Sequence, residues 1–151
     1  MAGCEKKDEV KIEPLHVEMK PLHADEIKDE LKRIHTTTYL EEYIVKIINE
    51  GSFQNLGFAT KTMDANLAHS VDALDIARFT ILLRGEKSSD DKRAKKAEIF
   101  YTSNCGGCHG NDGKGMDGTF PDLTIKTMLG IQMREKFLKE KLKIKDALNN
   151  K

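Results

Sequence analysis

Three residues near the middle of the second half of the chain combine sulfur and imidazole side chains on one short stretch. Cys105 and Cys108 are separated by two glycines, and His109 follows directly. Two thiols at this spacing on a tight turn can each form a thioether with a vinyl group of a porphyrin, and the adjacent imidazole can then ligate the iron. The same thiols could instead exchange a disulfide or contribute to a zinc site. The motif therefore predicts covalent attachment of haem c, with dithiol chemistry and zinc binding as alternatives.

Each alternative lacks a feature that it needs. A redox dithiol of the thioredoxin type belongs in a β-α-β context, and nothing in the chain alternates between apolar and polar residues as a strand would. A structural zinc site needs two more ligands at regular spacing. The remaining cysteine and the histidines offer no such spacing; they are Cys4, His16, His23, His35 and His69. Haem attachment is the interpretation that the residues favour.

The residues on either side of the motif resemble the class I cytochrome c family. Three features carry the resemblance: the aromatic pair Phe100-Tyr101 before the motif, Gly110 directly after it, and Pro121-Asp122-Leu123, which begins twelve residues after His109 (121 − 109). The resemblance implies a helical fold around one haem c, with His109 as a ligand of the iron. It also implies that the carbonyl of Pro121 accepts the other imidazole N–H of His109, a bond that would fix the orientation of the ring.

The second half of the family's pattern precedes the motif in this chain instead of following it. In the family, the Pro-x-Leu is followed by a helix, a glycine, a loop with an axial methionine and a last helix with an aromatic residue. Residues 39–85 match this order, with Gly51 after the helix, Met63 in the loop and Phe79 in the last helix. We infer that the fold is circularly permuted, with residues 86–91 joining the two halves. Chain termini often lie close together at the surface, which makes such a rearrangement tolerable.

Met63 is accordingly the predicted sixth ligand of the iron. A thioether ligand raises the reduction potential relative to a second histidine and leaves the iron without an open position, which suits electron transfer. No proline follows Met63, which departs from the frequent Met-Pro pair of the family. Met63 could instead fill the core, as most methionines do. The other candidate ligands are Met116, Met128, Met133, His16, His23, His35 and His69.

Hydrophobic periodicity predicts the helices that would position these residues, and the absence of strand patterns predicts an all-α fold. The expected helices span residues 24–34, 38–50, 70–84, 91–102 and 127–144. Thr38 with Glu41 predicts a capping box for the second helix, and Ser70 predicts the cap of the third. Residues 106–121 hold six of the eleven glycines and predict a loop.

Charge and hydropathy restrict the function further. The 25 basic residues balance the 25 acidic ones, which argues against nucleic-acid binding, and no run approaches the roughly 18 to 20 apolar residues of a spanning helix. The start, Met1 to Cys4, resembles the end of a bacterial lipoprotein signal and predicts a lipid anchor at Cys4, with an accidental cysteine as the alternative. We divide the chain into a tether (1–23), a permuted cytochrome c domain (24–124) and a basic amphipathic helix and tail (125–151).

These features together predict a monohaem c-type cytochrome that carries single electrons outside the cytoplasm, in the periplasm, and is not an enzyme. Its partners would be redox proteins, and we expect a monomer that meets the membrane only through Cys4. The first alternative is a five-coordinate haem c sensor or small peroxidase-like enzyme, for which His69 is the nearby polar candidate. The second alternative is one half of a domain-swapped cytochrome dimer.

Overall fold

The computed structural model describes residues 23–52 and 62–151, and these residues are mostly helical. Apart from an isolated bridge between Met116 and Phe120, they form no strand, so the predicted all-α fold is confirmed. The helices are α1 (Ala24–Arg33), α2 (Thr37–Glu50), α3 (Ala73–Leu83), α4 (Asp91–Lys96), α5 (Glu98–Asn104), α6 (Gly106–His109) and α7 (Leu129–Asn149). Cys4 and all but the last residue of the predicted tether lie outside the described residues.

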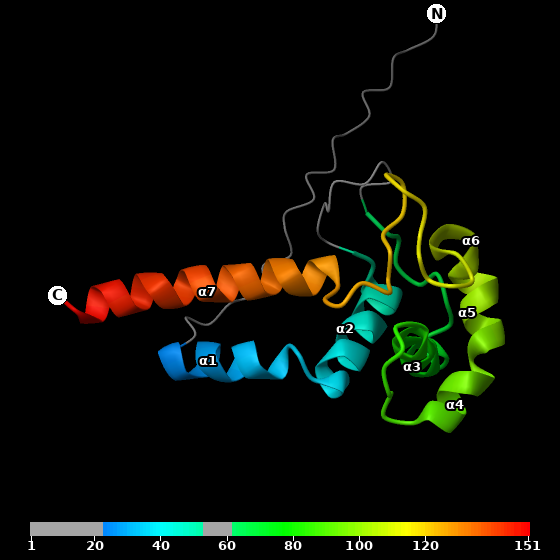
Figure 1. Cartoon of the computed structure of the whole chain (residues 1–151), viewed down its shortest axis with the longest axis horizontal. Helices are drawn as coiled ribbons and strands as arrows, with labels where there is room; N and C mark the ends of the chain where they lie inside the picture. Colours follow the sequence, from blue (N-terminus) through cyan, green and yellow to red (C-terminus); the bar gives the residue numbers. More distant parts are fainter. Residues whose placement is uncertain (1–22, 53–61) are drawn as a thin grey trace, which may run out of the picture.

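Helix α3 is the centre of the part of the molecule that carries the cysteine motif (Figure 1). It packs against α2 on one side and against α4 and α5 on the other. The ring of Phe79 in α3 lies 5.2 Å from that of Tyr101 in α5, measured between centroids. Ala97, where α4 meets α5, is buried, and its small side chain lets the helices approach closely. We call helices α2 to α6, with the loop that follows His109 up to residue 126, the motif unit.

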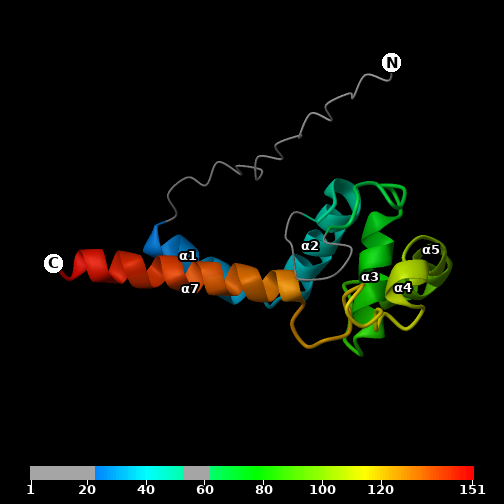
Figure 2. The same ribbon diagram turned by 90° about the horizontal axis from the view of Figure 1, so that it is seen from above.

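Helices α1 and α7 form a separate antiparallel pair, which we call the stem. In both views they lie side by side and point away from the motif unit (Figures 1 and 2). Ile27 and Ile34 contribute to its buried surface from the α1 side, and Ile131 and Leu138 from the α7 side. The stem therefore joins residues from both ends of the described chain through an apolar seam.

A salt bridge between partly buried side chains reinforces this seam. Arg134 of α7 donates to both carboxylate oxygens of Glu30 in α1, at 2.8 and 3.0 Å. Such bidentate pairs combine charge with fixed geometry. The guanidinium also lies 5.4 Å from the centre of the Phe137 ring. The register of α1 against α7 is therefore set by polar contacts as well as by apolar burial.

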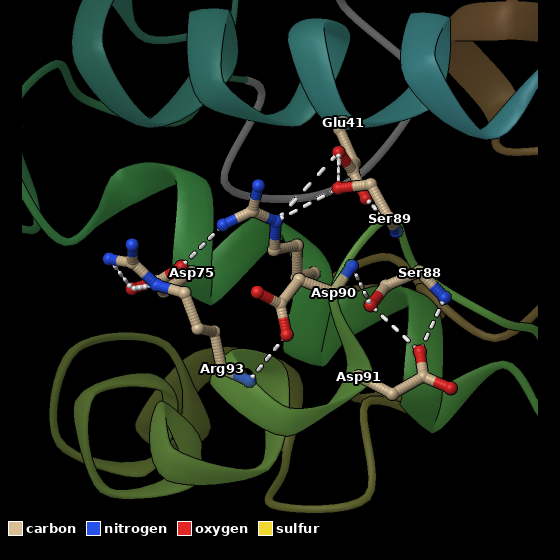
Figure 3. Close-up of polar contacts among 8 residues, drawn as sticks. Glu41, Asp75, Ser88, Ser89, Asp90, Asp91 and Arg93 are labelled. Carbon is tan, nitrogen blue, oxygen red and sulfur yellow. Dashed lines mark hydrogen bonds and ion pairs between the residues drawn. The ribbon is translucent and has the colours of Figure 1, made fainter.

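A network of polar side chains ties the connection between α3 and α4 to the helices around it (Figure 3). Glu41 of α2 is buried and accepts hydrogen bonds from the backbone N and from Oγ of Ser89, both at 2.7 Å. Asp75 of α3 accepts bonds from Arg78 at 2.8 Å and from Nη2 of Arg93 at 2.8 Å. The short connection is thus held from α2, while Asp75 links α3 to α4.

Two of the predicted helix caps are wrong. The cap of α2 is Thr36, whose Oγ1 accepts a bond from the backbone N of Tyr39 at 3.3 Å. Glu41 cannot complete a capping box with Thr38 because it points inward to Ser89. Helix α3 begins after Asp72 without a side-chain cap, so Ser70 does not serve as one.

The predicted helix over residues 91–102 is two helices that meet at Ala97. The backbone N of Ala97 bonds to both Arg93 O, at 3.2 Å, and Ala94 O, at 3.0 Å, which tightens the last turn of α4. Helix α5 then continues in a new direction as far as Asn104. The break lets Tyr101 become fully buried against α3 just before the cysteine motif.

Candidate functional site

The cysteine motif forms one tight helical turn at the end of α5. Cys105 ends α5, with its N bonded to Tyr101 O at 2.7 Å, and it also precedes the first residue of α6. Its own carbonyl accepts from the N of Cys108 at 3.2 Å and from that of His109 at 2.9 Å. These bonds keep both sulfurs and the imidazole on the same turn, as the spacing predicts.

Both thiols of the motif are free, and they differ in exposure. Cys105 is partly buried and Cys108 is exposed. Burial, with a smaller contribution from Cys108, raises the pKa of Cys105 to about 11. Before any covalent modification Cys105 is therefore a thiol at neutral pH, so it lacks the lowered pKa of a redox-active thiolate.

His109 is held in one tautomer by a backbone carbonyl. Its Nδ1 lies 3.1 Å from the carbonyl oxygen of Pro121, which is the contact that the family resemblance implies. A carbonyl can only accept, so Nδ1 must carry the hydrogen, and the lone pair of Nε2 is available to a metal. Burial lowers the pKa of His109, and the bond to Pro121 partly opposes this effect. The ring is therefore arranged as a neutral ligand, with the Pro121 carbonyl already bonded to the nitrogen that would not bind the metal.

The loop after His109 folds back over the imidazole. The N of Gly115 donates to His109 O at 2.6 Å, and the Phe120 ring meets the His109 ring edge-on with centroids 6.3 Å apart. Gly115 has a φ of +73°, and a Cβ there would collide with the carbonyl oxygens of Phe120 and Pro121. Only glycine fits this close approach without strain. The glycine-rich loop predicted from the sequence thus brings the Pro121 carbonyl to the ring.

Tyr101 and Arg84 support the same loop, and the sequence reasoning assigned a role to neither. The hydroxyl of Tyr101 donates to Gly110 O at 2.9 Å, directly beside His109. The guanidinium of Arg84 donates to backbone carbonyls beyond Pro121, among them Ile125 O at 2.7 Å. The role of Tyr101 could have been inferred from its position just before the motif. The role of Arg84 could not, because a basic residue at a helix end ordinarily faces solvent.

Met63 is partly buried against the core and is fixed through its backbone. Its N donates to Ser52 Oγ at 2.6 Å, and its carbonyl accepts from the N of Ser52 at 2.9 Å. Gly51, with φ at +82°, permits this pairing, since a Cβ there would lie 2.7 Å from Met63 O. Ser52 and Met63, which lie on either side of residues 53–61, are therefore bonded to each other just after the last turn of α2. Residues 53–61 lie outside the described residues, and the thioether remains a predicted ligand.

The segment after Met63 comes close to the cysteine motif. Residues 66–70 and Asn104, which directly precedes Cys105, line a hollow of about 390 Å³. His69 is exposed at this hollow, where its Nδ1 accepts a 3.4 Å bond from the N of Val71. Residues 66–70 and the end of α5 thus lie against the same surface hollow, although they are far apart in the sequence.

The other methionines proposed as ligands occupy different places. Met128 is buried at the start of α7, and Met133 is 43% exposed on that helix, so both belong to the stem. Met116 is 55% exposed on the loop after His109. Its backbone forms an antiparallel bridge with that of Phe120. These positions suit packing or solvent contact better than ligation.

The structure is a helical protein that carries two free thiols and a neutral imidazole on one turn. The Pro121 carbonyl fixes the orientation of the imidazole. The family model described as Cytochrome c matches residues 94–149, which include the motif, the Pro121 loop and α7. This match supports a c-type cytochrome family for the part of the chain that carries the motif. No curated protein and no solved structure gives a significant match. The family match runs in chain order and does not reach residues 37–83, so it leaves the permuted order untested.

Haem c, covalently bound and containing iron, is the cofactor of this family. The residues present fit it, because Cys105 and Cys108 offer two free sulfurs and His109 offers Nε2 on the same turn. A zinc site would need at least one further ligand group, and residues 23–52 and 62–151 contain no cluster of three His, Cys, Asp or Glu that could hold a metal. Members of the family are typically extracytoplasmic electron-transfer proteins. Among the described helices, none is long and apolar enough to cross a membrane.

Proposed function

We propose that this protein is a monohaem carrier of single electrons, in which His109 Nε2 and the thioether of Met63 would ligate the iron. The observation that carries the proposal is the 3.1 Å contact between His109 Nδ1 and Pro121 O beside two free cysteines. Bound haem c supplies a one-electron iron couple. The sequence contains one C-x-x-C-H motif and only three cysteines, which supports a single haem.

The roles of the chain's own residues follow from their contacts. Cys105 and Cys108 anchor the cofactor, and the Pro121 carbonyl keeps the hydrogen of His109 on Nδ1 so that Nε2 stays a ligand. Ser52 holds Met63 at the other end of the site through its backbone. A fixed ligand geometry reduces the rearrangement that accompanies electron transfer, which is why six-coordinate sites suit carriers.

The proposed order of the fold is permuted, with residues 37–83 supplying the half that carries the methionine. Packing of α3 against α4 and α5 supports this order, because the family's last and first helices cross in the same way. The buried Ala97 lies in this crossing region, where the family often has glycine. The connection between α3 and α4 is short and is held by Glu41 through Ser89, as a link between two ancestral ends would need to be.

We further propose that the carrier works in the periplasm as a monomer, with a lipid anchor at Cys4 and redox proteins as its partners. The extracytoplasmic habit of the family supports the compartment. The resemblance of residues 1–4 to the end of a lipoprotein signal supports the anchor. Mass spectrometry of the exported protein tests the anchor directly, since an acyl modification at Cys4 adds a defined mass.

Replacing Met63 tests the ligand assignment. In Met63→Ala we expect the methionine-to-iron charge-transfer band of the oxidised protein to disappear, because the thioether is lost. Met133→Ala is the matched control: Met133 is exposed on the stem, and the band should persist in that variant. Persistence of the band in Met63→Ala would exclude Met63 and remove the main support for the permuted order.

Two further measurements separate the alternatives. Carbon monoxide added to the reduced wild type should bind slowly, because it would have to displace a ligand that His109 or Met63 supplies to the iron. An immediate spectral shift at neutral pH would instead indicate a five-coordinate sensor or peroxidase-like site. Sedimentation should report a monomer. An obligate dimer would favour the half-domain interpretation, in which two chains complete each other.

A further inference from the structure

Arg84, at the C-terminal end of α3, places a charged guanidinium in the interior of the motif unit. Its side chain is only 3% exposed. Burying a charge is unfavourable unless hydrogen bonds replace the lost water. The partners of Arg84 therefore show what this buried charge is used for.

Three of these partners are backbone carbonyls of one short segment. Nη1 donates to Leu123 O at 3.2 Å and to Ile125 O at 2.7 Å, and Nη2 donates to Lys126 O at 2.5 Å. Nη2 also pairs with Glu86 at 3.1 Å, whose side chain is 47% exposed. The planar fork of arginine can serve several acceptors at once, which a lysine cannot do with the same geometry. Arg84 thus clamps residues 123–126 to the end of α3.

The clamped segment begins two residues after Pro121. Two bonds hold the chain next to Pro121. The N of Leu123 donates to Gly113 O at 2.7 Å, and Asp122 accepts from the N of Thr124 at 2.7 Å. Pro121 has no N–H of its own to hold it in place, so its carbonyl depends on these neighbours for its position. That carbonyl is the acceptor for His109 Nδ1. A continuous path of contacts therefore runs from Arg84 to the imidazole.

We propose that Arg84 is a positioning residue for the His109 ligand: its grip on residues 123–126 holds the Pro121 carbonyl against Nδ1 and so tunes the reduction potential. The inference rests on the proposed ligation of iron by His109. A firm Nδ1–H···O bond makes the imidazole a stronger donor and favours the oxidised iron. When this bond loosens, the potential rises.

The charge and the positioning effects of Arg84 have opposite signs, which allows a clean test. Removing a buried positive charge lowers the potential of a nearby redox centre, whereas loosening the His109 bond raises it. Arg84→Lys keeps the charge and loses the fork, so we expect the potential to rise. Glu86→Gln is the matched control for the exchange measurement, because it removes only the charge of the exposed partner and leaves the three carbonyl bonds.

Hydrogen exchange provides the local readout. In the reduced holoprotein, exchange of the His109 Nδ1 proton followed by NMR should be about tenfold faster in Arg84→Lys than in wild type or Glu86→Gln. The amide of Cys105, which is bonded to Tyr101 O and not to the segment that Arg84 clamps, should not change. General destabilisation would accelerate both protons together. If Arg84→Lys does not accumulate as holoprotein, the same comparison in Arg84→Gln replaces it, with the exchange ratio of the two protons as the readout.

Unchanged Nδ1 exchange together with an unchanged potential in Arg84→Lys would overturn the inference, as would equal acceleration at Cys105. A wild-type spectrum in which no histidine nitrogen shows the shift of an iron ligand would instead overturn the proposed function, and this inference with it. The two failures are therefore distinguishable in the same set of samples.

Discussion

The stem and the loops of the motif unit are stabilised by different kinds of contact. The stem buries an apolar seam, with Ile27 and Leu138 almost completely inaccessible, and adds the salt bridge between Glu30 and Arg134. The loops of the motif unit depend on side chains that bind backbone carbonyls, such as Tyr101 on Gly110 O. The stem forms wherever two helices have complementary apolar faces. The loops must instead hold their backbone in the conformation that positions His109 and the two cysteines for haem.

This difference separates stability from function within one small chain. The stem lies apart from the cysteine turn in both views (Figures 1 and 2), and its seam shares no residue with the contacts around His109. We therefore expect the stem to tolerate loosening without a change at the haem site. Loosening the packing of α3 against α5 at the helix crossing inside the motif unit should, in contrast, change the haem site.

The largest effect is expected at that crossing, from Phe79→Ala. Phe79 is buried and its ring packs on Tyr101, which leads into the cysteine turn. Truncation of a buried aromatic costs about 3–5 kcal/mol of unfolding free energy, and here it should also lower the yield of holoprotein. Denaturant titration and the haem absorbance per protein measure the two effects. Phe100→Ala, at a position 42% exposed, is the control, and equal losses in both variants would refute the distinction.

A smaller and separable effect is expected in the stem, from Leu138→Ala. Leu138 is completely buried, so the truncation should cost about 2–5 kcal/mol, up to the limit at which the stem opens on its own. The haem spectrum and potential should stay those of the wild type. Ile144→Ala, at a 56% exposed position further along α7, should be within about 0.5 kcal/mol of wild type. A changed haem spectrum in Leu138→Ala would show that the two regions are coupled.

The smallest effect concerns the pH dependence of the link between α3 and α4. Burial raises the pKa of Asp75, but hydrogen bonds and charge from Arg93 and Arg78 outweigh burial and hold that pKa below its usual value. A lowered folded-state pKa stabilises the protein above the ordinary pKa of about 4, and this stabilisation is lost as the pH falls through the lowered value.

Asp75→Asn should therefore be less stable than wild type at neutral pH by up to about 1 kcal/mol. The difference should shrink in acid, as the pH falls below the ordinary pKa of about 4 and through the lowered pKa of the folded-state carboxylate. Thermal unfolding followed by circular dichroism across this range measures it. Asp117→Asn, on the exposed loop, provides the reference, and a difference at Asp75 that is independent of pH would contradict the assignment.

Local patterns in the sequence were sufficient for the cysteine turn and for most of the helices. The contact between His109 and Pro121 spans only twelve residues, and the glycines between them permit the chain to turn back. The capping box of α2 was mispredicted because a cap pattern does not reveal a competing partner. Glu41 was expected to cap the helix together with Thr38, but it bonds instead to Ser89, which is 48 residues away.

The sequence alone determined the chemistry: two cysteines, a histidine and a proline at spacings that only a turn and a loop can use. The tertiary structure decided which distant surfaces meet, as in the pairing of Glu30 with Arg134 across 104 residues and of Arg84 with Ile125 across 41. The physical reason is that periodicity identifies an apolar face or a charged helix end but not its partner. Many faces of similar character are available, and only packing of the whole chain selects among them.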